Sequence, residues 1–174
     1  EAARRCQDAG YTVRFKFKPI IPVRGWREQA SQTVRRMFER TNPDVISLCV
    51  FMWMGVDEMK HRLDPAALDP EFLAAAEEAK EQMGEVRTRP FPPEVRAEIY
   101  RHYLREIRRH DPDVPVSLST ESFEMWSELS DEFCATATNY VCGCGPNSTP
   151  GCRKLENHPF RTPAKYGDVD FEAL

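Results

Sequence analysis

Three segments of this chain have the pattern of a strand that ends in polar or unusual residues and then runs directly into a helix. They are residues 11–26, 44–55 and 114–126. Proteins of the α/β class bind their ligands at the carboxyl ends of parallel strands. The residues that follow each predicted strand are therefore the first candidates for a functional site.

The first predicted strand has two different faces. Between residues 11 and 17, apolar side chains alternate with basic ones, so that Lys16 and Lys18 share a polar face. A buried parallel strand is normally apolar on both faces. The pattern therefore predicts either an edge strand or a strand whose inner side faces a polar cavity. Pro19 and Pro22 predict that ladder pairing stops here and that a stiff loop follows.

The remaining segments alternate between helices and strands. Residues 45–54 form the most apolar run, which predicts a central buried strand and its loop, because about ten residues are too few to span a membrane. Asp69 predicts a helix N-cap. Helical periodicity predicts helices at 26–40, 70–83, 94–109 and 123–133. A short strand is predicted at 116–118.

This order of elements predicts an α/β fold, the C-terminal half of a partial (β/α) barrel or open sheet. The 174 residues carry a net charge of 24 − 28 = −4, so no global basic field favours nucleic acid or a membrane. No signal peptide is visible, and we expect a cytoplasmic protein with no membrane partner. The first residue of the chain is not Met, and the first residues have the pattern of the last turns of a helix. We expect a piece of a longer protein whose N-terminal half is missing; a processed or tagged chain is the alternative.

Four cysteines crowd into a segment of low periodicity near the C-terminus, for which we expect an irregular Cys-rich tail over residues 134–174. Four thiolates suit zinc or an iron–sulfur cluster. Disulfides and free structural thiols are the alternatives, although a reducing compartment argues against disulfides. The candidate metal ligands are Cys134, Cys142, Cys144 and Cys152.

Polar residues at the ends of the predicted strands are the candidate binding groups. Ser119 and Glu121 follow the last strand and could hold a ribose, an amine or a carboxylate, but a capped helix start explains them equally well. Lys16 and Lys18 could meet a carboxylate or phosphate, or lie in solvent. Met52 could floor an apolar pocket or belong to the core. The arginines of helix 94–109 predict a solvated, salt-bridged face rather than a phosphate-binding one.

The three strand ends together resemble a known family. The segments KFKPIIPVRGW (16–26), DVISLCVFMWM (44–54) and YRHYLREIRRHDPDVPVSLSTESFEMW (100–126) are similar, in order and spacing, to the C-terminal half of radical SAM proteins related to spore photoproduct lyase. That family has a strand ending in Pro before Gly-Trp, and a helix that leads through DPDVP into a strand ending in ES. The resemblance spans about residues 10–129.

The resemblance implies a partial barrel over residues 1–133 in which a [4Fe-4S] cluster reductively cleaves S-adenosylmethionine. The 5′-deoxyadenosyl radical then abstracts a hydrogen atom from the substrate. Strand-end residues line the cavity for S-adenosylmethionine and substrate; the matching positions here are Lys16, Lys18, Met52, Ser119 and Glu121. The C-x3-C-x2-C cluster motif is absent from this chain, so the resemblance implies that the cluster ligands lie in the N-terminal half.

Two function hypotheses follow from the sequence. The first is the C-terminal part of a radical SAM, lyase-like enzyme that is not catalytic by itself, with a second metal or cluster at the cysteines. DNA-repairing members have a basic, tyrosine-containing C-terminal part, whereas this chain has the cysteine cluster, which favours another substrate. The second hypothesis is a non-catalytic α/β binding module stabilised by zinc or an iron–sulfur centre.

Overall fold

The described part of the protein is a mixed α/β structure built on a small parallel sheet. The computed structural model describes residues 1–84 and 88–132. A helix follows each of its strands, as the sequence predicts. In chain order the elements are α1 (Ala2–Asp8), β1 (Arg14–Ile20), α2 (Trp26–Arg40), β2 (Val45–Val50), α3 (Val56–Arg62), η1 (Pro65–Ala67), α4 (Pro70–Glu78), α5 (Pro93–His110), β3 (Val116–Leu118), α6 (Phe123–Glu128) and η3 (Ser130–Glu132).

The sheet has the order β1-β2-β3, and both of its strand pairs are parallel. Every residue of β2 is buried, which confirms the prediction of a central strand at this position. An apolar run of this kind suits a strand that has neighbours on both sides. The pairing places Ile46 beside Phe15 on one side and beside Val116 on the other.

The first strand extends farther than the sequence predicted. We expected pairing to stop before Pro19, yet β1 continues to Ile20, which pairs with Val50. The register shifts between Phe17 and Ile20. Because β1 lies at an edge of the described sheet and its register is irregular here, a residue without an N–H is accommodated, as proline is at edges and bulges.

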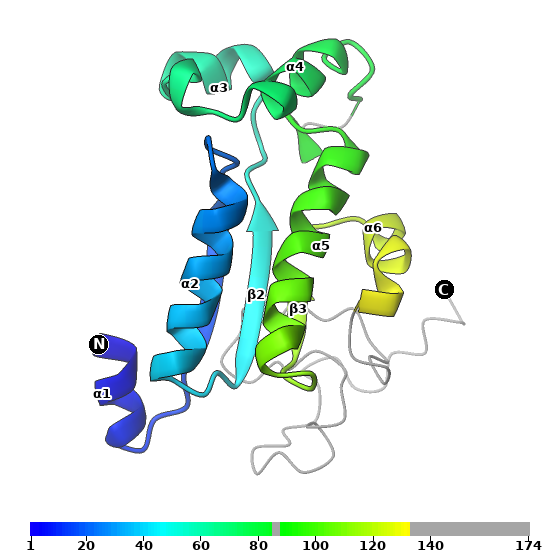
Figure 1. Ribbon diagram of the computed structural model, residues 1–174. Coiled ribbons are helices and arrows are strands. Elements are labelled where there is room, and N and C mark those ends of the chain that lie inside the picture. The colour runs from blue at the N-terminus through cyan, green and yellow to red at the C-terminus, as the bar shows by residue number, and fades with distance from the viewer. Residues whose placement is uncertain (85–87, 133–174) are drawn as a thin grey trace.

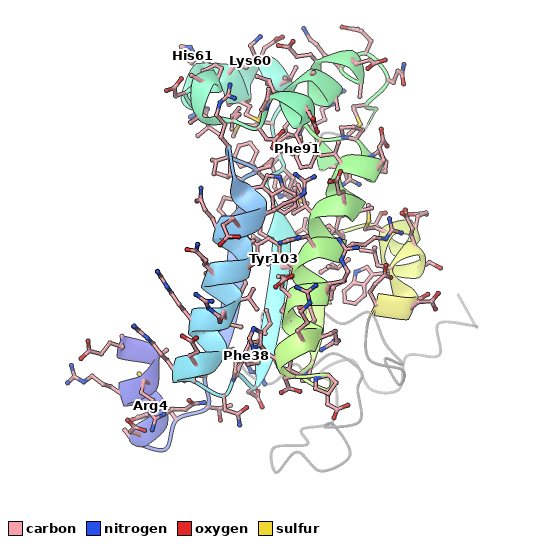
Figure 2. All side chains as sticks on the ribbon, in the orientation of Figure 1. Arg4, Phe38, Lys60, His61, Phe91 and Tyr103 are labelled. Carbon is pink, nitrogen blue, oxygen red and sulfur yellow. The ribbon has the colours of Figure 1, made fainter. Side chains whose placement is uncertain are left out.

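Helices α2 and α5 cover one face of the sheet, where they lie side by side in front of the strands (Figure 1). Their apolar stripes meet alternate residues of the strands in a single core. Tyr103 of α5 contacts Phe17 of β1, with ring centroids 5.4 Å apart. In Figure 2, Phe91 and Tyr103 lie in the interior, whereas Lys60 points outward from α3.

The predicted helix starts agree with the structure better than the predicted helix ends. The Asp69 side chain accepts hydrogen bonds from the amides of Glu71 and Phe72, which confirms the predicted cap. Helix α4 ends at Glu78, five residues before the predicted Met83. Helix α6 also ends early, and a separate short turn follows it.

Helix α5 is the longest helix of the described residues, and its outer face carries one ion pair within the helix, as predicted, and others to neighbouring elements. Arg101 donates to Glu128 and Glu132, and Arg109 pairs with Glu106. This confirms the salt-bridged face. Within residues 1–84 and 88–132, no helix is both long and apolar enough to cross a membrane.

Candidate functional site

The sheet has two chemically different faces. Phe15, Ile46 and Leu48 point to the side covered by α2 and α5. Because successive side chains of a strand point to opposite faces, the residues between them lie on the other side. We call this second side the polar face and define it by these residues: Lys16, Lys18, Ser47, Ser117 and Ser119.

The first row of the polar face crosses all three strands. Lys16 pairs with Ser47, and Ser47 pairs with Ser117. The two hydroxyl oxygens are 2.8 Å apart, and the serines are only 2% and 0% exposed. Buried serines at the centre of a parallel sheet are unusual, because such positions normally hold apolar residues. This row gives the face its polar character.

The second row lies nearer the carboxyl ends of the strands, where Lys18 meets Ser119. The ammonium group of Lys18 donates to the Ser119 hydroxyl at 3.2 Å. The Ser119 amide donates to Leu48 O at 2.7 Å, which continues the ladder past the end of β3. The Thr120 hydroxyl is 3.5 Å from that of Ser119. We call the three side chains of Lys18, Ser119 and Thr120 the binding corner.

The charge of the binding corner is not neutralised by a carboxylate of the described residues. Lys60 and Lys80 pair with Glu77 and Asp57, respectively, whereas the hydrogen bond of Lys18 goes to a neutral hydroxyl. An exposed ammonium with a buried hydroxyl beside it can hold a carboxylate or a phosphate. The two lysines are the charged groups among the residues that define the polar face.

The backbone is left-handed just past two of the three strands. Thr120 follows β3 with φ 69°, and Trp53 follows β2 with φ 79°. A left-handed conformation is unfavourable for β-branched and bulky residues, and such strain concentrates at functional sites. Trp53 is also 54% exposed, whereas its neighbour Met52 is 5% exposed and forms a bridge with Pro90.

Glu121 comes from the same loop as Ser119, but its carboxylate is held by α5. Its Oε1 accepts a hydrogen bond from Arg96 Nε at 2.9 Å, and its Oε2 accepts one from the Ser122 amide at 3.2 Å. The Arg96 and Glu121 side chains are 3% and 0% exposed. The Ser122 hydroxyl caps α6 by accepting from the Met125 amide. The helix-cap explanation of this loop therefore applies to Ser122, while Glu121 forms a buried ion pair.

Two partners of Glu121 were not found by sequence reasoning. Tyr100 donates its hydroxyl to Glu121 Oε1 at 2.9 Å and accepts from the Val50 amide at 3.0 Å. Burial and the Glu121 carboxylate raise the pKa of Tyr100 well above its ordinary value, so the phenol remains a donor. The sequence pattern that could have indicated these contacts is the spacing of Arg96 and Tyr100. The two residues are four positions apart on one helix face, and the acidic residue Glu121 follows the next strand.

The predicted metal site lies outside the part of the chain that the structure describes. Cys134, Cys142, Cys144 and Cys152 lie outside the described residues. Within the described ranges, no group of three or more histidine, cysteine or acidic side chains is arranged to hold a metal ion.

A pocket of about 400 Å³ lies between α3, α4 and the Arg89–Pro90 segment. Asp57 and Lys80 line it and form an ion pair of 2.7 Å. None of the strand-end candidates lines this pocket, so it is separate from the binding corner.

The structure thus brings Lys18 and Ser119 together, places Lys16 one row behind them, buries Met52 beyond β2 and turns the Glu121 carboxylate toward α5.

Comparison with protein-family models, curated proteins and solved structures finds no match for this chain.

Proposed function

We propose that this chain is the C-terminal part of a radical SAM enzyme similar to spore photoproduct lyase, and that its polar face lines the cavity for S-adenosylmethionine and substrate. The ordered strand-end segments of the sequence are the first support. The observation that carries the proposal is the two-faced sheet, with α2 and α5 on one side and Lys18 with Ser119 on the other. In a (β/α) barrel, helices pack outside the strands and function gathers at their carboxyl ends.

The binding corner has the chemistry that the amino-acid end of S-adenosylmethionine needs. The ammonium of Lys18 suits a carboxylate, and a serine hydroxyl can both accept from an amine and donate to a carboxylate. In this proposal Lys16 and Met52 line the same cavity farther from the corner, and Glu121 supports the loop that carries Ser119.

The described residues do not fit the iron–sulfur cluster. They contain two cysteines, Cys6 and Cys49, of which one is exposed and the other is buried in β2. A [4Fe-4S] cluster is held by several thiolates. The C-x3-C-x2-C motif is absent from this sequence, so in this proposal the cluster ligands come from the N-terminal half of the same protein. A cluster held there would supply the electron for cleavage of S-adenosylmethionine, and this chain alone is not expected to catalyse the reaction.

The test begins with the reading frame upstream of Glu1. We expect a strand followed by C-x3-C-x2-C. The protein from the complete frame, reconstituted with iron and sulfide without oxygen, should convert S-adenosylmethionine to 5′-deoxyadenosine and methionine when a reductant is added. The matched control replaces the three motif cysteines with alanine, which should abolish 5′-deoxyadenosine formation.

Two results would overturn the proposal. One is an upstream frame without that motif, and the other is a reconstituted protein that incorporates no iron and forms no 5′-deoxyadenosine. Zinc at about one ion per chain in either case would favour the non-catalytic binding module, with the four C-terminal cysteines as ligands.

A further inference from the structure

We propose that Arg96 and Glu121 are positioning residues that hold the loop of residues 119–122 so that Ser119 stays against Lys18. Neither side chain is assigned a contact with ligand. The inference deepens the proposed function, because it states how the binding corner keeps its shape. The corner binds an anionic group, which in the proposed function is the carboxylate of S-adenosylmethionine.

The loop needs an outside restraint. Thr120 adopts φ 69°, which a β-branched residue rarely adopts unless the surrounding structure imposes it. The loop is also short: β3 ends at Leu118, and α6 begins at Phe123. The residue directly after the strained position is Glu121, and its side chain makes the contacts that connect this loop to α5.

The Glu121 carboxylate is held at both oxygens. Oε1 accepts from Arg96 Nε and from the Tyr100 hydroxyl, each at 2.9 Å. Oε2 accepts from the Ser122 amide at 3.2 Å, with Arg96 Nη2 at 3.5 Å. These partners fix the direction of the side chain, because one guanidinium, one phenol and one backbone amide together satisfy the carboxylate in a water-poor setting.

The other end of the restraint is rigid. Arg96 and Tyr100 are one turn apart on α5, which is anchored in the core by Ile99 and Leu104, both 0% exposed. Arg96 Nη1 also donates to Phe91 O at 2.7 Å.

The Tyr100 hydroxyl extends the network to a second strand. It accepts from the amide of Val50, the last residue of β2. The same turn of α5 therefore holds the carboxyl ends of both β2 and β3. Through Glu121, α5 therefore positions the loop that carries Ser119.

The first experiment needs no ligand. Amide hydrogen exchange is measured by NMR in the protein expressed from its complete reading frame, comparing wild type with Glu121→Gln. The reporter is the Ser119 amide, which donates to Leu48 O. We expect its exchange to be about tenfold faster or more in the variant, while the amide of Val34 in α2 changes much less. Glu132→Gln is the matched control, since Glu132 pairs with Arg101 of the same helix, and it should leave Ser119 unchanged.

A double variant covers the case in which Glu121→Gln fails to fold. Arg96→Met with Glu121→Leu removes the restraint without leaving a buried unpaired charge. It should also speed exchange at Ser119 selectively. Unchanged exchange at Ser119, or equal acceleration at Ser119 and Val34, would overturn the positioning role in favour of a general contribution to stability.

The second measurement is the affinity of the reconstituted protein for S-adenosylmethionine. Glu121→Gln should weaken it about tenfold, and Glu132→Gln should not change it. If Ser119 loosens but wild-type protein does not bind S-adenosylmethionine, the positioning inference stands and the proposed function fails. If wild type binds and Glu121→Gln binds equally well, the positioning inference fails alone.

Discussion

Arg96 and Glu121 form an ion pair inside the protein, at 2.9 Å between Nε and Oε1 and with side chains 3% and 0% exposed. The pair joins α5 to the loop after β3, residues that are 25 positions apart in the sequence. The surface pairs of α5 are more exposed to solvent than this buried pair: the Arg101 and Glu128 side chains are 36% and 46% exposed. Solvent screens such exposed pairs, and they contribute little to stability.

The buried pair predicts a non-additive mutational effect. Arg96→Met leaves an uncompensated carboxylate in the interior, so we expect it to lower the free energy of unfolding by about 3–5 kcal/mol. Adding Glu121→Leu should restore most of that loss, because replacing a whole buried pair with apolar side chains is often close to neutral. Urea unfolding of wild type, both single variants and the double variant measures the coupling. Additive losses in the double variant would contradict the prediction.

Tyr100 predicts a loss of stability in alkaline solution. Burial, and then the Glu121 carboxylate, raise the pKa of Tyr100 well above 10.0. An unfolded tyrosine titrates near pH 10. Above about pH 10 the unfolded chain therefore binds fewer protons than the folded chain, and the free energy of unfolding falls as the pH rises. Below about pH 10 both states are protonated, and the contribution is constant.

The measurement for Tyr100 is an absorbance titration together with unfolding at several alkaline pH values. Wild type and Tyr100→Phe should form equal amounts of phenolate at about pH 10, because Tyr100 keeps its proton there. The stability of Tyr100→Phe should decline less steeply above that pH. An extra phenolate in wild type at about pH 10 would show that Tyr100 titrates normally and would contradict the prediction.

His102 predicts a loss of stability in mild acid. Burial lowers the pKa of His102, although its hydrogen bond to Arg27 O, of 3.0 Å, acts in the opposite direction. A carbonyl oxygen can only accept, so Nε2 carries the proton. Glu106 raises the pKa, and the cations Arg105 and Arg27 lower it further. The folded chain takes up the proton less readily than the unfolded chain, so stability is full above about pH 6.5 and falls as the pH decreases through the folded pKa.

A substitution isolates the contribution of His102. In His102→Gln the side-chain amide can still donate to Arg27 O, but it does not titrate in this range. The free energy of unfolding should therefore depend less on pH between about pH 7 and pH 5 in the variant than in wild type. Equal slopes would mean that other groups carry the acid sensitivity. NMR titration of the His102 ring protons gives the folded pKa directly, and we expect a value below 6.5.

The sequence predicted the elements of the described fold more accurately than their ends. Helix 26–40 is correct to the residue because its apolar stripe is regular and Asn42-Pro43 ends it. The predicted end of α4 was wrong, since residues 79–82 form turns although Met83 continues the apolar pattern. The end of β1 was wrong because the effect of Pro19 depends on whether the strand is central or at an edge, which is a tertiary property.

The candidate site was predictable in position but not in its contacts. The strand ends suggested Lys18 and Ser119, and a parallel sheet brings the two together across 101 residues. Glu121 shares that loop, yet its carboxylate faces α5. Sequence periodicity could not show this, because the left-handed backbone at Thr120 changes the direction in which the next side chain points. The partial barrel and the metal site remain predictions.

The binding corner predicts that Lys18 contributes charge to ligand affinity. In the reconstituted protein from the complete frame, Lys18→Met should raise the Kd for S-adenosylmethionine about 10- to 100-fold, because a hydrogen bond to a charged group contributes about 1.5–3 kcal/mol. Lys60→Met is the matched control, since Lys60 pairs with Glu77 on α4 and lies away from the polar face. Ser119→Ala removes one hydroxyl and should have a smaller effect. Calorimetric titration measures all three variants. Equal affinities in Lys18→Met and Lys60→Met would show that the ligand does not use this corner, even if the protein cleaves S-adenosylmethionine.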